Sequence, residues 1–164
     1  MATAIFYTTS TGNSTEIANK IAEELNGIEV FDLSSNLDKI AEYEKVIIGC
    51  STWGDGELND DFDEVWDEFS EVDFSGKTVA LFSLGDQEGY GDTFADALGI
   101  IYEQVSQKGA NVIGFTSTDG YDYDESKAEI DGKFAGLVID EDNQDDLTDD
   151  RIKSWSEDIK NDIL

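Results

Sequence analysis

Short apolar stretches recur along the chain and are separated by longer stretches in which apolar and polar residues alternate with helical spacing. The short stretches are rich in β-branched and aromatic residues, which favours buried strands. They are Ala2–Tyr7, Ile28–Leu33, Lys45–Cys50, Lys77–Leu84 and Asn111–Phe115. After its first lysine, Lys45–Cys50 has no charged residue, as expected for a central parallel strand covered on both faces.

The longer stretches predict amphipathic helices. The first begins at Glu16, buries one face and ends at Asn26–Gly27, since glycine commonly ends helices. Four further helices are indicated by shared apolar faces: one capped by Ser34 or Ser35 with Leu37, Ile40 and Ala41; one with Phe62, Val65, Trp66 and Phe69; one with Phe94, Ala97, Leu98, Ile101, Tyr102 and Val105 that ends at Gly109; and one with Ile152, Trp155, Ile159 and Ile163 that begins near Thr148 or Asp149.

Five strands that alternate with five helices predict a single-domain α/β protein over residues 1–164. Its parallel sheet is doubly wound, with the strand order 2-1-3-4-5, right-handed crossovers and helices on both faces. Ligands of such sheets bind beyond the carboxyl ends of the strands, at the switch point between strands 1 and 3. The segments that follow strands 1, 3 and 4 are therefore expected to share one site.

Charge is the strongest feature of the composition. The chain has 39 acidic and 10 basic residues and a formal net charge of −29. This excludes binding to nucleic acid through its phosphates, disfavours anionic membranes and favours partners with a basic patch. We find no signal peptide and no apolar run long enough to span a membrane, so we expect a cytoplasmic protein.

Other residue types limit the chemistry. No histidine is present, which removes the commonest general base and the usual metal ligand. Cys50 is the single cysteine, so no internal disulfide forms, and it is expected to be a buried strand residue because no basic residue adjoins it. The acidic run Asp140–Asp146 does not fit a calcium loop, since Asp145 occupies the position that needs glycine.

A hydroxyl-rich loop, Thr8–Thr15, joins the first strand to the first helix. Free backbone N–H groups and the positive end of the helix dipole meet there, which makes an anion site. The loop lacks lysine, arginine and the nucleoside-triphosphate pattern, so it suits a monophosphate held by neutral donors. The candidate binding residues are Thr9, Ser10, Thr11, Gly12, Asn13 and Ser14. The alternative is an ordinary serine- and threonine-rich turn with a helix cap.

This loop resembles the phosphate-binding loop of flavodoxins, the pattern T-x-T-G-N/K-T/S, at Thr9–Ser14. Cys50–Glu57 looks like the first flavin-ring loop of that family, and Gly85–Tyr90 looks like the second. Order and spacing match over essentially the whole chain, which therefore resembles a long-chain flavodoxin. The resemblance implies flavin mononucleotide (FMN) as cofactor. It also implies a small three-stranded insertion in the fifth strand within Thr116–Glu141, a segment too long for a simple connection, with Leu137–Ile139 as the returning part of that strand.

By resemblance, Trp53 stacks on the inner face of the flavin ring and Tyr90 on the outer face. The alternatives are a core tryptophan at a strand end and an exposed loop tyrosine. The resemblance also places the Gly54–Asp55 peptide beside the ring nitrogen that gains a proton on reduction. The other residues expected at the cofactor are Ser51, Thr52, Gly56, Leu84, Gly85, Asp86 and Asp92.

The acids around the proposed ring are Asp55, Glu57, Asp86, Glu88 and Asp92. They oppose the addition of negative charge to the flavin, which implies a low potential; the alternative is a merely solvated acidic face. No nucleophile–base set stands out, so we expect an electron carrier and not an enzyme.

The expected function is low-potential one-electron shuttling by a monomer. Its partners would be basic-patched redox proteins such as ferredoxin–NADP reductase or a 2-oxoacid oxidoreductase. The first alternative is an FMN-dependent NAD(P)H:quinone reductase of the same fold, whose nicotinamide and quinone pocket Tyr90 would block. The second is an acidic binding module, such as a DNA mimic, that needs no cofactor.

Overall fold

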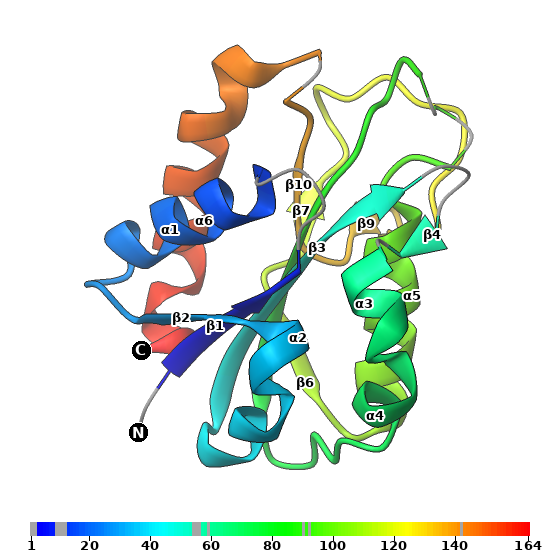
Figure 1. Cartoon of the computed structure of the whole chain (residues 1–164). Coiled ribbons are helices and arrows are strands. Elements are labelled where there is room, and N and C mark those ends of the chain that lie inside the picture. The colour runs from blue at the N-terminus through cyan, green and yellow to red at the C-terminus, as the bar shows by residue number, and fades with distance from the viewer. Residues whose placement is uncertain are drawn as a thin grey trace.

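The computed structural model describes residues 3–8, 13–53, 57–58, 60–89, 91, 93–141 and 143–164. For residues 13–14, 51–53, 57–58 and 60–61 it describes the backbone only. Figure 1 shows a twisted central sheet with helices on both faces.

The central sheet has the strand order predicted from the sequence. β2 (Glu29–Asp32), β1 (Thr3–Tyr7), β3 (Lys45–Trp53) and β5 (Thr78–Leu84) lie side by side and run parallel. The next position holds two short strands. β6 (Asn111–Ile113) pairs with the first half of β5, and β10 (Leu137–Ile139) pairs with its second half. The predicted order 2-1-3-4-5 and the interrupted fifth strand are therefore both confirmed.

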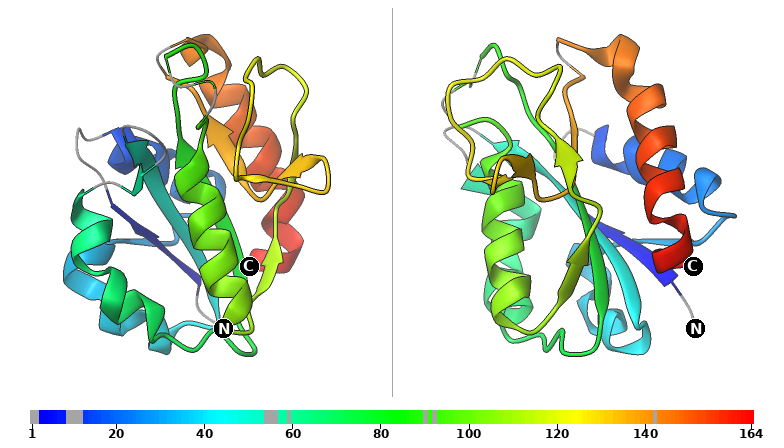
Figure 2. Two further views of the ribbon diagram at one scale, coloured as in Figure 1. Left: turned by 90° about the vertical axis from the view of Figure 1, so that its right-hand side faces the viewer. Right: turned by 180° about the vertical axis from the view of Figure 1, so that it is seen from behind.

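The insertion between β6 and β10 forms its own small antiparallel sheet. β7 (Thr116–Ser117), β9 (Lys133–Phe134) and β8 (Glu129–Ile130) pair in that order, and Figure 2 shows them beside the edge of the main sheet. Tyr121, Tyr123 and Phe134 of the insertion pack around the buried ring of Phe94, with ring centroids 5.4 to 6.0 Å from it. This aromatic cluster attaches the insertion to the segment that leads into α5 (Asp96–Gln107).

Each face of the sheet has its own core. α1 (Asn13–Glu24) and α6 (Thr148–Ile163) cover one face, where Ile5 is buried, and the other face buries Phe6 beneath the remaining helices. Successive strand residues point to opposite faces, so both neighbours are buried. The helices of the second face are α2 (Leu33–Asn36), the 3₁₀-helix η1 (Leu37–Glu42), α3 (Asp60–Glu64), α4 (Trp66–Ser70) and α5. The described chain also contains the short strand β4 (Glu57–Leu58) and the 3₁₀-helix η2 (Asp145–Leu147).

The predicted cap of the second helix was wrong. Asp32, the last residue of β2, caps α2, because its Oδ1 accepts hydrogen bonds from Ser34 N at 2.9 Å and Ser34 Oγ at 2.6 Å. Ser34 is therefore inside the helix. Aspartate satisfies free N–H groups as well as serine does, and the strand ends one residue earlier than its apolar pattern suggested.

The predicted third helix is two short helices, interrupted at Val65. Their apolar residues still share a face, since the ring of Phe62 lies 5.0 Å from that of Phe69 and 5.9 Å from that of Trp66. Two further boundaries differ. Phe94 lies before α5 and not in it, and α1 begins three residues earlier than expected. Trp155 is 2% exposed, as predicted for the core, whereas Trp66 is only partly buried against it.

Candidate functional site

The carboxyl ends of β1, β3 and β5 meet at one edge of the sheet. The register pairs Tyr7 with Gly49 and Ser51 with Leu84, and Thr8 N donates to Gly49 O at 3.1 Å. The three segments expected to form the site follow these strand ends, so all three leave the sheet at the same edge (Figure 1). This edge is the topological switch point of the fold, where ligands of such sheets bind.

The predicted phosphate loop leads into α1. Thr9, Ser10, Thr11 and Gly12 lie outside the described residues. Asn13 and Ser14 form the start of α1, which begins five residues after Thr8. The first backbone N–H groups of a helix have no partner within it, and the helix dipole places partial positive charge there. The described backbone therefore supplies anion donors at this edge.

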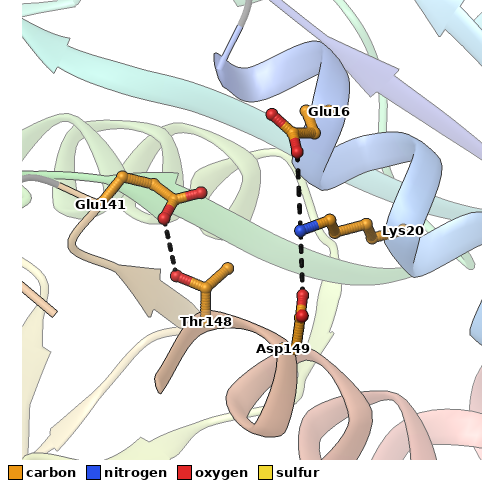
Figure 3. A network of polar contacts seen from close by, with 5 residues as sticks. All are labelled: Glu16, Lys20, Glu141, Thr148 and Asp149. Carbon is orange, nitrogen blue, oxygen red and sulfur yellow. Dashed lines mark hydrogen bonds and ion pairs between the residues drawn. The ribbon is translucent and has the colours of Figure 1, made fainter. Parts of the chain in front are cut away.

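Lys20 links α1 to α6. Its Nζ lies 2.9 Å from Asp149 Oδ1 and 3.6 Å from Glu16 Oε1, while Glu141 accepts a hydrogen bond of 2.9 Å from Thr148 (Figure 3). The bond to Asp149 is the main reason why the pKa of Lys20 is raised. Exposed pairs of this kind contribute about 0.2–1 kcal/mol. The lysine also offsets the charge of Glu16, the acid in the first turn of α1.

The segment after the central strand forms a hairpin. Ser51, Thr52 and Trp53 are the last three residues of β3, and Thr52 and Trp53 pair antiparallel with Leu58 and Glu57 of β4. The backbone of Trp53 belongs to the end of the strand. The turn residues Gly54, Asp55 and Gly56 lie outside the described residues, and the stacking of Trp53 on the flavin stays a prediction.

The segment after β5 is tightly packed. Leu84 is 7% exposed and belongs to the core beneath α1 and α6, so its backbone, and not its side chain, lies at the site edge. Gly85 N donates to Ile139 O at 3.0 Å. A Cβ on Gly85 would lie 3.1 Å from both Ala95 N and the ring of Phe94, so glycine permits this close approach.

Asp86 stabilises the turn that follows. Its Oδ1 accepts hydrogen bonds from Gly89 N at 2.8 Å and Glu88 N at 3.1 Å, and the bond from Gly89 is the main reason why its pKa is lowered. Asp86 therefore keeps its negative charge at the site edge, while its Oδ1 accepts hydrogen bonds from within its own turn. Tyr90 and Asp92, also expected at the cofactor, lie outside the described residues.

Sequence reasoning missed a buried carboxylate beside this turn. Asp140 directly follows β10, is 0% exposed, and accepts hydrogen bonds from the backbone and side chain of Gln87. Asn143 joins the two acids, since its Nδ2 lies 2.8 Å from Asp86 Oδ1 and 2.9 Å from Asp140 Oδ2. The only local signal was an acid directly after an apolar strand, inside a run of acids.

Within the described ranges, no group of three or more acids or cysteines is arranged to hold a metal ion.

Cys50 is a free thiol in the core, as predicted. It is 0% exposed, and burial raises its pKa to about 12. A thiol that stays protonated is a poor nucleophile.

In the part of the chain that the structure describes, no helix is both long enough and apolar enough to cross a membrane.

The chain matches known proteins over nearly its whole length. The family model described as Flavodoxin matches residues 5–155. The chain belongs to the flavodoxin family. A flavodoxin from Nostoc sp. is 47% identical over 162 residues, which cover 97% of this chain and 95% of the relative. Flavodoxin 2 of Escherichia coli is 40% identical over 164 residues, covering 97% and 95%.

Solved structures agree with this assignment. The crystal structure of Fusobacterium nucleatum flavodoxin bound to flavin mononucleotide has a TM-score of 0.94 with this flavodoxin chain and 35% sequence identity. The match covers 99% of each chain. The family resemblance inferred from the three loops is thereby confirmed.

Proposed function

We propose that this flavodoxin is a low-potential one-electron carrier with one non-covalently bound FMN. The observation that carries the proposal is the convergence of the three loop-bearing strand ends at one edge of the sheet. The FMN-bound relative from F. nucleatum supports the choice of cofactor. When bound, FMN supplies the one-electron chemistry, and the chain supplies binding, orientation and electrostatics.

The described start of α1 suits the phosphate of this cofactor, because its first backbone N–H groups have no partner within the helix. The side chains of Thr9, Ser10, Thr11, Asn13 and Ser14 would be the further donors, and Gly12 would let the backbone approach closely. Neutral donors suffice, because hydrogen bonds to a charged group contribute about 1.5–3 kcal/mol each. The ring would lie between Trp53, on its inner face, and Tyr90, on its outer face. The other residues proposed to surround the ring are Ser51, Thr52, Gly54–Gly56, Leu84–Asp86 and Asp92.

The acidic edge would set the potential. One carboxylate about 10 Å from the ring contributes roughly 0.4 kcal/mol in bulk water, and more through protein. About 1.4 kcal/mol corresponds to about 59 mV for a one-electron couple. Asp86 is held in place by its turn, and Glu88 is exposed beside it. Several such charges would oppose the addition of negative charge to the flavin, and would therefore lower the potential of its second one-electron reduction most.

The partners we propose are redox proteins with a basic patch, such as ferredoxin–NADP reductase or a 2-oxoacid oxidoreductase. The net charge of −29 supports such complementarity and speaks against nucleic acid. We also propose that the protein works as a monomer in the cytoplasm, and a single cysteine fits a reducing compartment.

A redox titration of the FMN-loaded protein, followed by visible absorption, tests the proposal. We expect two separate one-electron steps, and no oxidation of NAD(P)H by the protein alone. A single two-electron step together with steady consumption of NAD(P)H and quinone would favour the quinone reductase instead. A protein that is colourless after incubation with FMN and removal of the free flavin would favour the acidic binding module.

A further inference from the structure

Gln87 lies within the second ring loop but is not among the residues expected to touch the flavin, and its side chain is buried. Gln87 is 5% exposed. Its Nε2 donates to Asp140 Oδ2 at 2.7 Å, and its backbone N donates to the same oxygen at 3.1 Å. Its Oε1 accepts a hydrogen bond of 2.5 Å from Asp122 N. Both the nitrogen and the oxygen of the side-chain amide therefore take part in hydrogen bonds.

These bonds join three distant parts of the chain. Gln87 lies in the turn after β5, Asp122 lies in the insertion between β7 and β8, and Asp140 follows β10. Asn143 adds a second link between the last of these segments and the turn, because it donates to both Asp86 and Asp140. The turn is thus held by the insertion on one side and by the end of the split strand on the other.

The insertion also holds the far end of this loop. Gly91 O accepts hydrogen bonds from Asp124 N at 2.7 Å and from Glu125 N at 3.1 Å. A Cβ on Gly91 would lie 2.8 Å from Gln87 O, so the two residues pack closely. Gln87 and Gly91 flank Tyr90 in the sequence, and the backbone is therefore anchored on both sides of the residue proposed to cover the ring.

We propose that Gln87 is a positioning residue that sets the affinity of this flavodoxin for the flavin ring, by holding the Gln87–Gly91 loop against Asp140 and the insertion. The inference rests on the proposed function, since it concerns the same site. Glutamine suits the role because one terminus carries both a donor and an acceptor. Alanine would leave the buried Asp140 without its side-chain donor from this residue and the Asp122 N–H without its acceptor.

The test compares Gln87→Ala with a matched control, Gln104→Ala, in the full-length protein. Gln104 Nε2 donates to Ser70 O at 3.1 Å, on α5 and away from the loop. Dissociation constants for FMN and riboflavin are measured by quenching of flavin fluorescence. Loss of two buried hydrogen bonds lowers the fraction of molecules in which the loop is correctly held, and we expect about tenfold weaker binding of both flavins by Gln87→Ala. Both should weaken equally, because the ring is common to the two flavins and the phosphate is not. The control should stay within about twofold of the parent for both flavins.

A second variant, Gln87→Glu, separates positioning from loss of folding. An ionised carboxylate at position 87 would face the carboxylate of Asp140. Asp86, Glu88 and Asp122 are further acids in the two segments that Gln87 joins. Tyr121 is near enough to interact with the charge of Asp140, and the guanidinium carbon of Arg151 lies 4.1 Å from the Tyr121 ring centroid. Near about pH 8 the affinity for riboflavin should fall at least as far as in Gln87→Ala. Near about pH 5.5 a protonated glutamic acid reproduces the donor and the acceptor, so affinity should return to within about threefold of the parent at that pH.

The inference is overturned if Gln87→Ala binds riboflavin within about twofold of the parent, or if Gln87→Glu follows the same pH dependence as the parent. In both cases the parent would still bind FMN, and the proposed function would stand. Absence of FMN binding by the parent overturns the proposed function and this inference together. Circular dichroism spectra that match the parent show that each variant has folded.

Discussion

The ring of Phe82 on β5 lies directly over Gly49 on β3, its partner in the register of the sheet. A Cβ on Gly49 would lie 2.0 Å from Cζ of this ring, a distance no real contact allows. Phe82 is fully buried beneath α1 and α6. Glycine at this position therefore lets the ring fill the core just below the carboxyl edge that carries the site.

Gly49→Ala should destabilise the protein, because the ring must move within a closely packed core. Overpacking of this kind costs about 1–3 kcal/mol, measurable by urea unfolding. The double variant Gly49→Ala/Phe82→Leu should lose less stability than the sum of the two single variants, since the smaller side chain leaves room for the methyl group. Strictly additive losses would show that the ring contact is not the cause.

Stability should fall at alkaline pH, and Cys50 should contribute to the fall. Burial raises the pKa of its thiol from 9.0 to about 12. The folded thiol stays protonated where the unfolded one ionises, so its contribution is complete below pH 9.0 and is lost progressively as the pH rises through the folded pKa of about 12. One such group lowers the free energy of unfolding by about 1.4 kcal/mol per pH unit in that window.

The measurement is urea unfolding of the parent and of Cys50→Ala between about pH 8 and pH 11, a range that spans the unfolded thiol pKa. Burial also raises the pKa of Tyr121, from 10.0 to about 12, so part of the fall should remain in the variant. The variant should nevertheless lose stability less steeply than the parent above about pH 9. Two parallel curves would rule out the thiol as a contributor.

Electron transfer to a basic reductase should be steered by charge. The net charge of −29 attracts a basic partner over distances near the Debye length, which is about 30 Å at 0.01 M salt and under about 8 Å at 0.5 M. The association rate, measured by stopped flow, should therefore fall at least about tenfold over this range. A rate independent of salt would leave no role for electrostatic steering.

Local pattern predicted the sheet and the helices well, because each strand and helix has a side that must be buried. The pattern failed where two residue types can both cap a helix, because Asp32 caps α2 and not Ser34 or Ser35 as predicted. Pattern also could not show that Val65 interrupts a helix whose apolar face continues across the break. The β4 hairpin was missed because a pairing of two residues leaves almost no periodic signal.

The strand ends that precede the three predicted loops meet at one edge of the sheet, as expected from the sequence. The loops could be proposed because each carries short-range chemistry after a strand end, and their contacts with the cofactor stay predictions. The contact of Gln87 with Asp140 joins residues 53 positions apart, and no periodicity predicts such a pairing. Asp140 is the first acid of the run Asp140–Asp146, and nothing in that run showed that it is fully buried.

The phosphate site makes a prediction of its own. Thr11→Val removes a hydroxyl donor while keeping the shape of the side chain. It should weaken FMN by about tenfold or more and change riboflavin by less than about twofold, because only FMN carries the phosphate. The measurement is fluorescence titration with each flavin. An equal loss for both would assign Thr11 to the ring or to folding.

The most direct test is an equilibrium titration of the full-length protein with FMN, riboflavin and FAD under one set of conditions. Several hydrogen bonds to one phosphate predict binding of one FMN per chain, at least about a hundredfold tighter than riboflavin, with FAD weaker than FMN. Equal affinity for FMN and riboflavin, or no binding of FMN, would contradict the assignment of this sheet edge as an FMN site.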